Sequence, residues 1–241
     1  MPELDKESTV ARIVAENPSL ARVFQKHGID YCCHGDVTVP EACQEARLDP
    51  EAVFGELEAV LGSSTAAAET KPSQLSDTAL IAHIVERHHG YLRRALPYVL
   101  PVMAKVAQVH ASRDAKLERL EEAVRSLAAN LVPHLAEEEE VLFPMLLSRA
   151  RNPTAVKASM AKMREEHLAV GALLAQVRKL TDGFAVPEWG CNTYRVLMGE
   201  LAELEADILR HVHLENHVLA PRFEAIAAGR YSPSRSPETK A

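Results

Sequence analysis

Apolar residues recur at spacings of three and four along most of the chain, which is the pattern of amphipathic helices. Residues 1–62 contain four short runs of this kind: TVARIVAENP, PSLARVFQKHG, PEACQEARL and DPEAVFGELEAVLG. Pro18 suits a first helical turn, and Gly28 suits the end of a helix. Between the second and third runs lies GIDYCCHGDVTV, which has two glycines and no helical period. We therefore expect a small helical domain over residues 1–62 that contains a loop.

Residues 63–75 are small, polar and without periodicity, which is typical of a linker between domains. The helical pattern then continues almost unbroken over residues 76–229. Breaks at SRD, RNPT and TDGFAVPEWG divide it into four segments, at about 77–108, 113–149, 154–181 and 188–228. Short connections make sequential helices antiparallel, so the pattern predicts an up-down four-helix bundle. Residues 230–241 are rich in serine and proline, and we expect a disordered tail there.

Composition supports an all-α fold, because glycine is scarce (10 residues) and aromatic residues make up only 5% of the 241 residues. The net charge of −7 without a long basic cluster argues against nucleic-acid binding. No apolar run approaches the ~20 residues that a membrane span needs. The first residues, MPELDKESTV, are acidic and polar, unlike a secretory signal. We therefore expect a cytoplasmic protein whose four cysteines are reduced.

The bundle segment contains an internal repeat. HLAEEEEVLFP, which begins at His134, and HVHLENHVLAP, which begins at His211, both read H-x3-E-x2-V-L-x-P. Each copy also follows a single histidine at a similar distance: His89 lies 45 residues before His134, and His167 lies 44 residues before His211. The bundle therefore consists of two helical hairpins. Each has one single histidine on its first helix and one H-x3-E pair on its second.

Helix geometry selects one acid of the EEEE run. At 100° per residue, with His134 at zero, Glu138 lies at about +40°. It falls within an apolar stripe near about +50°, whose members are Leu120, Val124, Leu127, Leu131, Val141, Leu142 and Met145. Glu137, Glu139 and Glu140 lie at about −60°, +140° and −120°. For these three acids we expect a solvated, negative flank.

The second copy leads to the same assignment. Glu215 lies at about +40° from His211, within the stripe formed by Leu197, Leu201, Leu204, Ile208, Val218 and Leu219. His213 and His217 point away from this stripe. We expect them to be surface residues, together with His83 and His110.

A carboxylate in a core stripe is costly unless it is paired or bound to a metal. Two such glutamates with four inward histidines can form a shared cation site. Histidine and carboxylate without thiolate suit iron or manganese better than zinc. Six ligands are too many for one metal ion that must keep an open coordination position. They suit two metal ions if both glutamates bridge the two. The alternative for His89 and His167 is that each is a satisfied core histidine, and His88 competes with His89 for the inward position.

The order H…H-x3-E…H…H-x3-E on a four-helix bundle resembles the hemerythrin-like proteins. The segments FQKHGIDYCCHGDVTVPEAC, HHGYLRRALP and EEEEVLFP resemble the Repair of Iron Centers family in particular. The resemblance extends from about residue 5 to residue 225. It implies a non-haem, oxo-bridged di-iron protein of the bacterial cytoplasm, associated with nitrosative and oxidative stress and with repair of iron–sulfur clusters. By motif, it places the ligands of two iron ions on His89, His134, Glu138, His167, His211 and Glu215.

The cysteine pair of the family falls on Cys32 and Cys33. His34 departs from the family pattern, in which a small residue such as glycine is expected. Adjacent cysteines do not have the C-x-x-C spacing of zinc or thioredoxin-type sites. The loop could hold a transient iron, carry a nitrosyl group or pass electrons. The alternative is that these residues only pack the domain interface.

Three functions remain open from the sequence. The first is donation of iron to damaged iron–sulfur proteins, which would be the partners of this chain. The second is enzymatic reduction of nitric oxide to nitrous oxide, and the third is a reversible sink or sensor for NO or O₂. Whether the protein is an enzyme depends on this choice. The expected assembly is a monomer or a homodimer.

The position of Glu138 in the core stripe leads to a test. Replacement of Glu138 by Ala removes a bridging ligand and is expected to cost the protein its iron, measured as iron per purified chain. Glu140→Ala is the matched control, because this position lies on the flank and its loss should leave iron bound. Equal iron contents in the two variants would contradict the assignment.

Overall fold

The computed structural model describes residues 4–63 and 71–227. The expected tail at 230–241 and most of the expected linker at 63–75 lie outside the described residues. Within the described part the regular structure is helical, apart from one isolated bridge between Thr9 and Thr38. The prediction of an all-α fold, with a helical bundle preceded by a small helical region, is confirmed.

The N-terminal region is built from short helices around the cysteine loop. The helices are α1 (Val10–Glu16), η1 (Pro18–Leu20), α2 (Ala21–Lys26), α3 (Val39–Ala46) and α4 (Pro50–Ser63). Gly28 follows α2 with a φ of 67°, a conformation that glycine adopts without strain. Thr38 and Glu41 cap the start of α3 reciprocally, and Thr9 caps α1. The loop between Gly28 and Thr38 is therefore held at both ends by defined helix termini.

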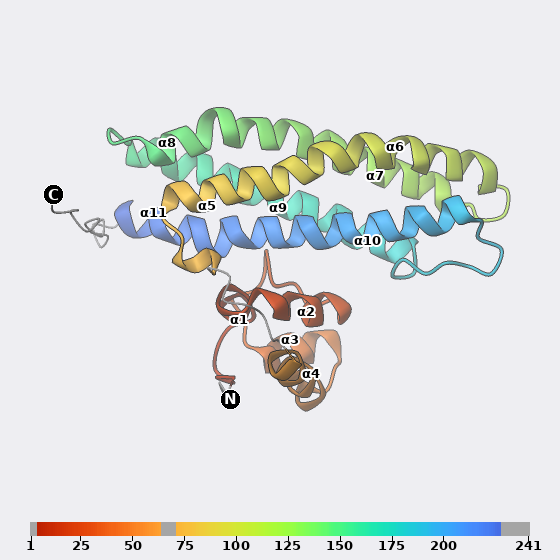
Figure 1. The fold of residues 1–241 in the computed structure, drawn as a ribbon, viewed down its shortest axis with the longest axis horizontal. Helices are drawn as coiled ribbons and strands as arrows, with labels where there is room; N and C mark the ends of the chain where they lie inside the picture. The colour runs from red at the N-terminus through yellow and green to blue at the C-terminus, as the bar shows by residue number, and fades with distance from the viewer. Residues whose placement is uncertain (1–3, 64–70, 228–241) are drawn as a thin grey trace.

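Four long helical rods form the bundle, and they run along one another (Figure 1). A short turn, η2 (Pro72–Gln74), precedes them, and Ser76 caps the first rod. The first rod is α5 (Asp77–His83), η3 (Ile84–His89) and α6 (Gly90–His110), and the second is α7 (Lys116–Glu137), η4 (Glu138–Leu142) and α8 (Phe143–Leu147). The third rod is α9 (Pro153–Leu180), and the fourth is α10 (Asn192–His213), η5 (Leu214–Leu219) and α11 (Ala220–Ala227). These rods match the four segments that the apolar periodicity predicts.

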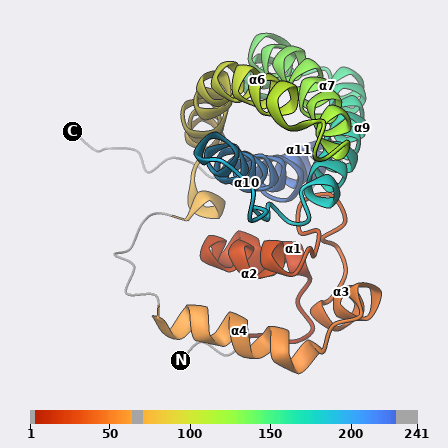
Figure 2. The same ribbon diagram turned by 90° about the vertical axis from the view of Figure 1, so that its right-hand side faces the viewer.

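Viewed from its end, the bundle has α6, α7, α9 and α10 around a common axis (Figure 2). α6 packs against α7 and α10, and α9 packs against the same two helices. Apolar clusters fill both ends of the bundle. The cluster around Leu142 and Met160 lies at one end, and that around Met103 and Leu197 at the other. Among the helices of the described residues, none combines the length and the apolar character needed to cross a membrane.

Three of the four rods contain a π-helical turn, namely η3, η4 and η5. In each, a backbone N–H bonds to the carbonyl five residues back: Gly90 to Val85, Phe143 to Glu138, and Ala220 to Glu215. Pro144 and Pro221 follow two of these turns, and proline has no N–H to close an ordinary α turn. The same turn does not produce the same burial in both copies. Val141 is 46% exposed, so the prediction that it lies in the core stripe is wrong, whereas Val218 at the matching position is 6% exposed.

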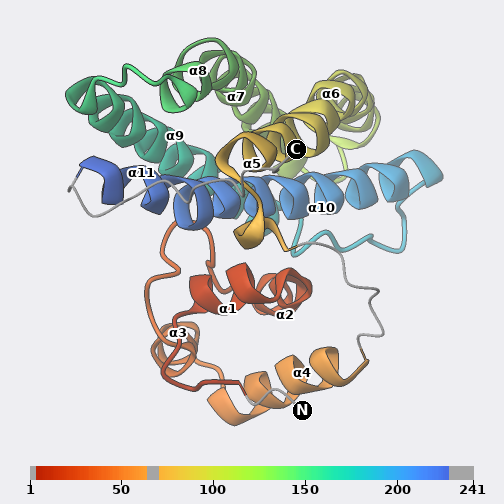
Figure 3. The same cartoon turned by 60° about the vertical axis from the view of Figure 1, so that its left-hand side comes forward.

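Of the N-terminal helices, α1 and α2 lie against the fourth rod (Figure 3). Phe24 and Tyr31 share one apolar cluster with Ile208 and Val212 of α10. His213 is only 2% exposed, and its Nδ1 lies 3.1 Å from the carbonyl oxygen of Tyr31. The prediction that His213 is a surface residue is therefore wrong. The N-terminal region covers this side of α10. Positions that would be exposed to water in an isolated bundle therefore lie in the interface between the bundle and the N-terminal region.

The prediction that His217 is a surface residue is also wrong. His217 is half-buried, and its Nε2 lies 3.0 Å from the carbonyl oxygen of Cys32. Arg178 of α9 and Gln25 of α2 meet at the carboxylate of Glu205, at distances from Glu205 of 2.9 Å and 3.1 Å. Polar contacts thus join the N-terminal region to the fourth rod, and Arg178 of α9 shares the Glu205 carboxylate with Gln25.

Gly35 allows a close approach that holds the cysteine loop in place. A Cβ atom there would lie 2.7 Å from the carbonyl oxygen of Tyr31 and 2.8 Å from the Cβ of Ala11. We expect Gly35→Ala to lower the free energy of unfolding by about 1–3 kcal/mol in urea denaturation, because the backbone must shift. Gly55→Ala in α4 is the control. Its new Cβ meets nothing within 4 Å, and the free energy of unfolding should rise by up to about 1 kcal/mol.

Candidate metal centre

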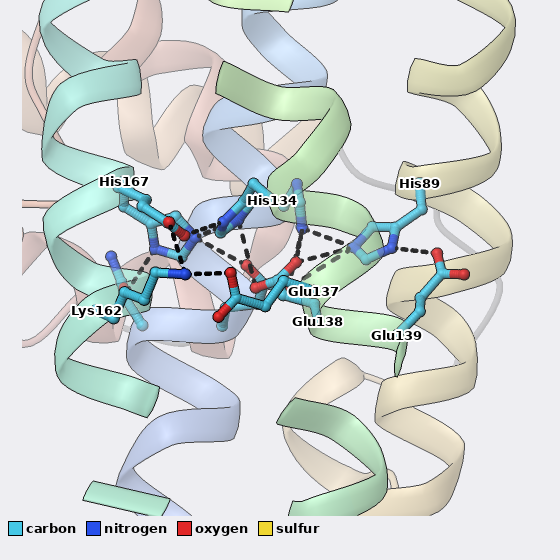
Figure 4. A network of polar contacts seen from close by, with 11 residues as sticks. His89, His134, Glu137, Glu138, Glu139, Lys162 and His167 are labelled. Atoms are coloured by element: carbon cyan, nitrogen blue, oxygen red, sulfur yellow. Dashed lines mark hydrogen bonds and ion pairs between the residues drawn. The ribbon is translucent and has the colours of Figure 1, made fainter. Parts of the chain in front are cut away.

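The six histidines and glutamates singled out in the sequence meet at the centre of the bundle. His89 ends η3, His134 lies in α7, Glu138 begins η4, His167 lies in α9, His211 lies in α10 and Glu215 lies in η5. All six are at most 3% exposed. Figure 4 shows His89, His134, Glu138 and His167 converging from three different rods. The structure thus brings together every residue of the predicted set, whereas their binding of metal stays a prediction.

The six side chains form two groups that share both glutamates. One group contains His89 and His211, and the other contains His134 and His167. Within the groups, the facing Nε2 atoms lie 3.1 Å apart for His89 and His211, and 3.2 Å apart for His134 and His167. Each histidine pair therefore presents two nitrogens to one point.

Each glutamate directs one oxygen to each histidine pair. Glu138 places Oε2 3.4 Å from Nε2 of His89 and Oε1 3.4 Å from Nε2 of His134. Glu215 places Oε1 2.9 Å from Nε2 of His211 and Oε2 3.1 Å from Nε2 of His167. This is the arrangement expected of two carboxylates that bridge two cations.

The hydrogen bonds outside the cluster leave the inward nitrogens free to bind a cation. Nδ1 of His89 lies 2.7 Å from a Glu139 oxygen, and Nδ1 of His134 lies 2.8 Å from a Glu166 oxygen. A carboxylate accepts hydrogen bonds, so each Nδ1 donates a proton to it, and whenever the ring is neutral the inward Nε2 keeps a lone pair. His167 is held in the same way by the side-chain oxygen of Asn216, at 3.0 Å. Such outer contacts are typical of metal-bound histidines.

Unpaired buried atoms also fit a pair of cations. Both carboxylate oxygens of Glu138 are buried without a hydrogen-bond partner. Burial, together with the negative charge of Glu215, raises the pKa of Glu138. Although burial opposes the charged form, contacts with Glu138 and Glu215 raise the pKa of His89 to about 10. Without metal, protons would have to balance the negative charge of the two carboxylates. Metal cations can take the place of these protons.

Glu139 has a different role from the one predicted. It is half-buried, bonds to His89 and pairs with Arg93 of α6 at 2.8 Å. The prediction that it belongs to a solvated flank is wrong. Glu137 is half-buried and pairs with Lys162 of α9 (Figure 4), whereas Glu140 is exposed as predicted. A position on the edge of a core stripe faces the neighbouring helix of a bundle, and this signal was present in the wheel angle of Glu139.

His88 is a further buried residue that the sequence analysis did not assign to the site. Its Nδ1 lies 3.0 Å from an oxygen of Asp207, and its ring stacks on His211 with 9° between the planes. Nδ1 of His211 itself is buried without a partner. The two adjacent histidines thus have different positions: His89 faces the cluster, and His88 packs against the ring of His211.

The cysteine loop docks next to this cluster. The Sγ atoms of Cys32 and Cys33 lie 3.6 Å apart, and Sγ of Cys33 lies 3.7 Å from the carbonyl oxygen of His167. The hydrogen bond between the thiols lowers the pKa of Cys33 and, with burial, raises the pKa of Cys32. His34 is mostly exposed and contacts Asp30 at 2.8 Å, so it faces the loop and not the bundle.

A cavity of about 340 Å³ lies between the N-terminal helices and the bundle. Cys32, Cys33 and Asp30 line it on the loop side, and Leu174 and Ala175 of α9 line it on the bundle side. A second cavity of about 440 Å³ also reaches Cys33. Cys33 thus lies between two cavities at the interface.

Two family models match the chain. One, described as a domain of unknown function (DUF542), matches residues 6–61, and the other, the hemerythrin HHE cation binding domain, matches residues 80–223. The second match spans more than half of the chain.

Curated relatives match nearly the whole chain. The iron-sulfur cluster repair protein ScdA of Staphylococcus haemolyticus is 32% identical over 222 residues, which are 91% of this chain and 99% of that protein. The iron-sulfur cluster repair proteins YtfE of Yersinia pseudotuberculosis and Yersinia pestis are each 33% identical over 215 residues, or 85% of this chain and 91% of theirs. From its two matched domains and these relatives, the chain belongs to the Repair of Iron Centers family.

Proposed function

We propose that the protein is a cytoplasmic non-haem di-iron protein that repairs damaged iron–sulfur clusters by supplying iron. The observation that carries the proposal is the sharing of Glu138 and Glu215 between two histidine pairs. His89 and His211 would hold one iron, His134 and His167 the other, and both glutamates would bridge them. When bound, such a pair supplies exchangeable, redox-active iron with open positions for small ligands. The link to cluster repair is supported by the relatives, which are iron-sulfur cluster repair proteins.

A small recess supports release of iron from one side of the site. It lies between the second rod and α9, reaches His134 and Glu138, and has a volume of about 10 Å³. Such a volume corresponds to roughly one water molecule. The half-buried carboxylates of Glu137 and Glu166 line the same recess. Lys162 lines the recess too and pairs with both carboxylates, so a departing cation would have to displace its ammonium group from Glu137 and Glu166 before it reaches water.

A second function, reduction of nitric oxide to nitrous oxide, is favoured by one observation. The two histidine pairs face the same two carboxylates, so two small ligands could bind side by side. Each of two reduced irons could then contribute one electron to coupling of two NO molecules. Repair by iron supply consumes the bound iron, whereas NO reduction consumes NO and electrons. One set of experiments therefore separates the two functions.

We expect the iron-loaded protein to restore activity to an enzyme whose iron–sulfur cluster has been damaged by NO, under anaerobic conditions with sulfide supplied. Recovery should exceed that from the same concentration of free ferrous iron. Gas analysis of protein with NO and a reductant is the companion measurement. Suppose that recovery is no better than with free iron and that nitrous oxide forms over many turnovers. The function would then be NO reduction, and the proposal of cluster repair would be wrong.

The contact between Glu139 and His89 leads to a second prediction. Glu139→Gln removes the carboxylate that orients the His89 ring, and we expect iron affinity to fall by about 10–100-fold. Affinity is measured by competition with a ferrous chelator. Glu140→Gln is the matched control. The carboxylate of Glu140 is exposed and contacts none of the six residues, so the iron affinity of this variant should equal that of the unaltered chain. An equal affinity in both variants would remove Glu139 from the site.

A further inference from the structure

The docked cysteine pair has no part in holding the proposed iron ions, yet it is built into the same network. Cys32 and Cys33 are free thiols whose sulfur atoms are in contact at 3.6 Å. Cys32 is buried and Cys33 is half-buried. The adjacent positions and contacting sulfur atoms suit the chemistry of a dithiol, which gives up two electrons when a disulfide forms.

Asp30 organises this loop and leaves little capacity for an open metal site. Its Oδ1 accepts hydrogen bonds from the backbone N–H groups of both Cys32 and Cys33, each at 2.9 Å. Its Oδ2 contacts Nδ1 of His34 at 2.8 Å. A carboxylate already bonded through both oxygens is a poor third ligand beside two thiols. The geometry of the loop therefore favours redox chemistry of the two sulfur atoms over cation binding.

Two short connections join the pair to the His167 side of the metal centre. The first is direct, from Sγ of Cys33 to the carbonyl oxygen of His167, at 3.7 Å. The second runs through Asn216, whose Nδ2 donates to the carbonyl oxygen of Cys32 at 2.9 Å. The Oδ1 of the same side chain accepts from Nδ1 of His167 at 3.0 Å. Two hydrogen bonds thus link the peptide of Cys32 to the His167 ring, whose Nε2 faces Glu215.

Neither of the other two cysteines has such a connection among its described contacts. Cys43 is buried in the apolar cluster of the N-terminal region. Cys191 is exposed at the start of α10, where it contacts His110 at 3.3 Å. The connection to the centre is therefore particular to the loop.

We propose that Cys32 and Cys33 are the built-in two-electron reductant of the iron pair. This inference rests on the proposed function. In the step, the two S–H bonds break, one S–S bond forms, and two protons are released. Two electrons pass to the centre, where two ferric ions become two ferrous ions. The pair thus returns the centre to the ferrous state, which is the more labile form for donation and the form that can reduce small ligands.

The dithiol must then be regenerated. The Cα atoms of adjacent residues are about 3.8 Å apart, which is shorter than the usual ~4.4–6.8 Å of a disulfide. A disulfide between neighbours is therefore strained and readily reduced. Cys33 lines the cavity of about 340 Å³, so a low-molecular-weight thiol can attack from there. Two external thiols would become one external disulfide, and both cysteines would again be thiols.

An anaerobic oxidative titration of the full chain tests the proposal. The protein is first loaded with ferrous iron, its iron content is measured, and oxidant is added in single-electron equivalents. The iron state is followed by Mössbauer spectroscopy, and the thiols by alkylation and mass spectrometry of the peptide that contains Cys32 and Cys33. We expect the first two equivalents per chain to appear as a Cys32–Cys33 disulfide while both irons stay ferrous.

Two variants sharpen this test. In Cys33→Ser the iron should turn ferric from the first equivalent, and Cys191→Ser should behave as the unaltered chain. Ferric iron beside two free thiols in the unaltered chain would overturn the inference, and this measurement requires no variant to fold. Failure to load two irons would instead overturn the proposed function. The two failures are thus distinguished before any oxidant is added.

Discussion

Two carboxylates buried among four imidazoles, in the middle of an apolar bundle, are the constraint on which the rest of the structure depends. Transfer of charge into such an interior is costly, and here both oxygens of Glu138 lack a hydrogen-bond partner. The cluster therefore requires positive charge, either as protons or as metal cations. Placement of the glutamates between two histidine pairs divides that positive charge between two positions. The proposed di-iron centre would account for this division, because one cation would leave half of the nitrogens and carboxylate oxygens unused.

The residues around the cluster hold it ready for cations. Glu139, Glu166 and Asn216 each bond to the outer nitrogen of one histidine, which leaves the inner nitrogen facing the two glutamates. His88, which is bonded to Asp207, supports His211 in another way, by stacking on its ring. Three π turns contain His89, Glu138 and Glu215, three of the six residues of the cluster. Because each turn interrupts the regular bonding of its rod, these positions are more easily explained by the site than by the stability of the bundle.

The N-terminal region adds a second chemistry to the same centre. Its apolar helices share a cluster with α10, and its loop presents the Cys32 carbonyl to Asn216 and His217. Through Asn216 that carbonyl is linked to His167, so the position of the loop and the orientation of one imidazole depend on each other. This linkage connects the small helical region directly to the six-residue cluster of the bundle. Under the proposed function, the loop would place two thiols beside a centre that changes oxidation state.

The sequence by itself determined the four rods, the N-terminal helices and the six residues that meet in the bundle. It could do so because the helical period assigns each residue to a face, and because the H-x3-E repeat marks the same face twice. Only the tertiary structure decided which rods are neighbours, and hence that Glu139 bonds to His89 and that His88 supports His211. Likewise, His213 and His217 lie on the outer face of a bundle helix but contact the cysteine loop. A wheel angle states how a side chain points from its own helix; what stands opposite is set by packing between segments far apart in the chain.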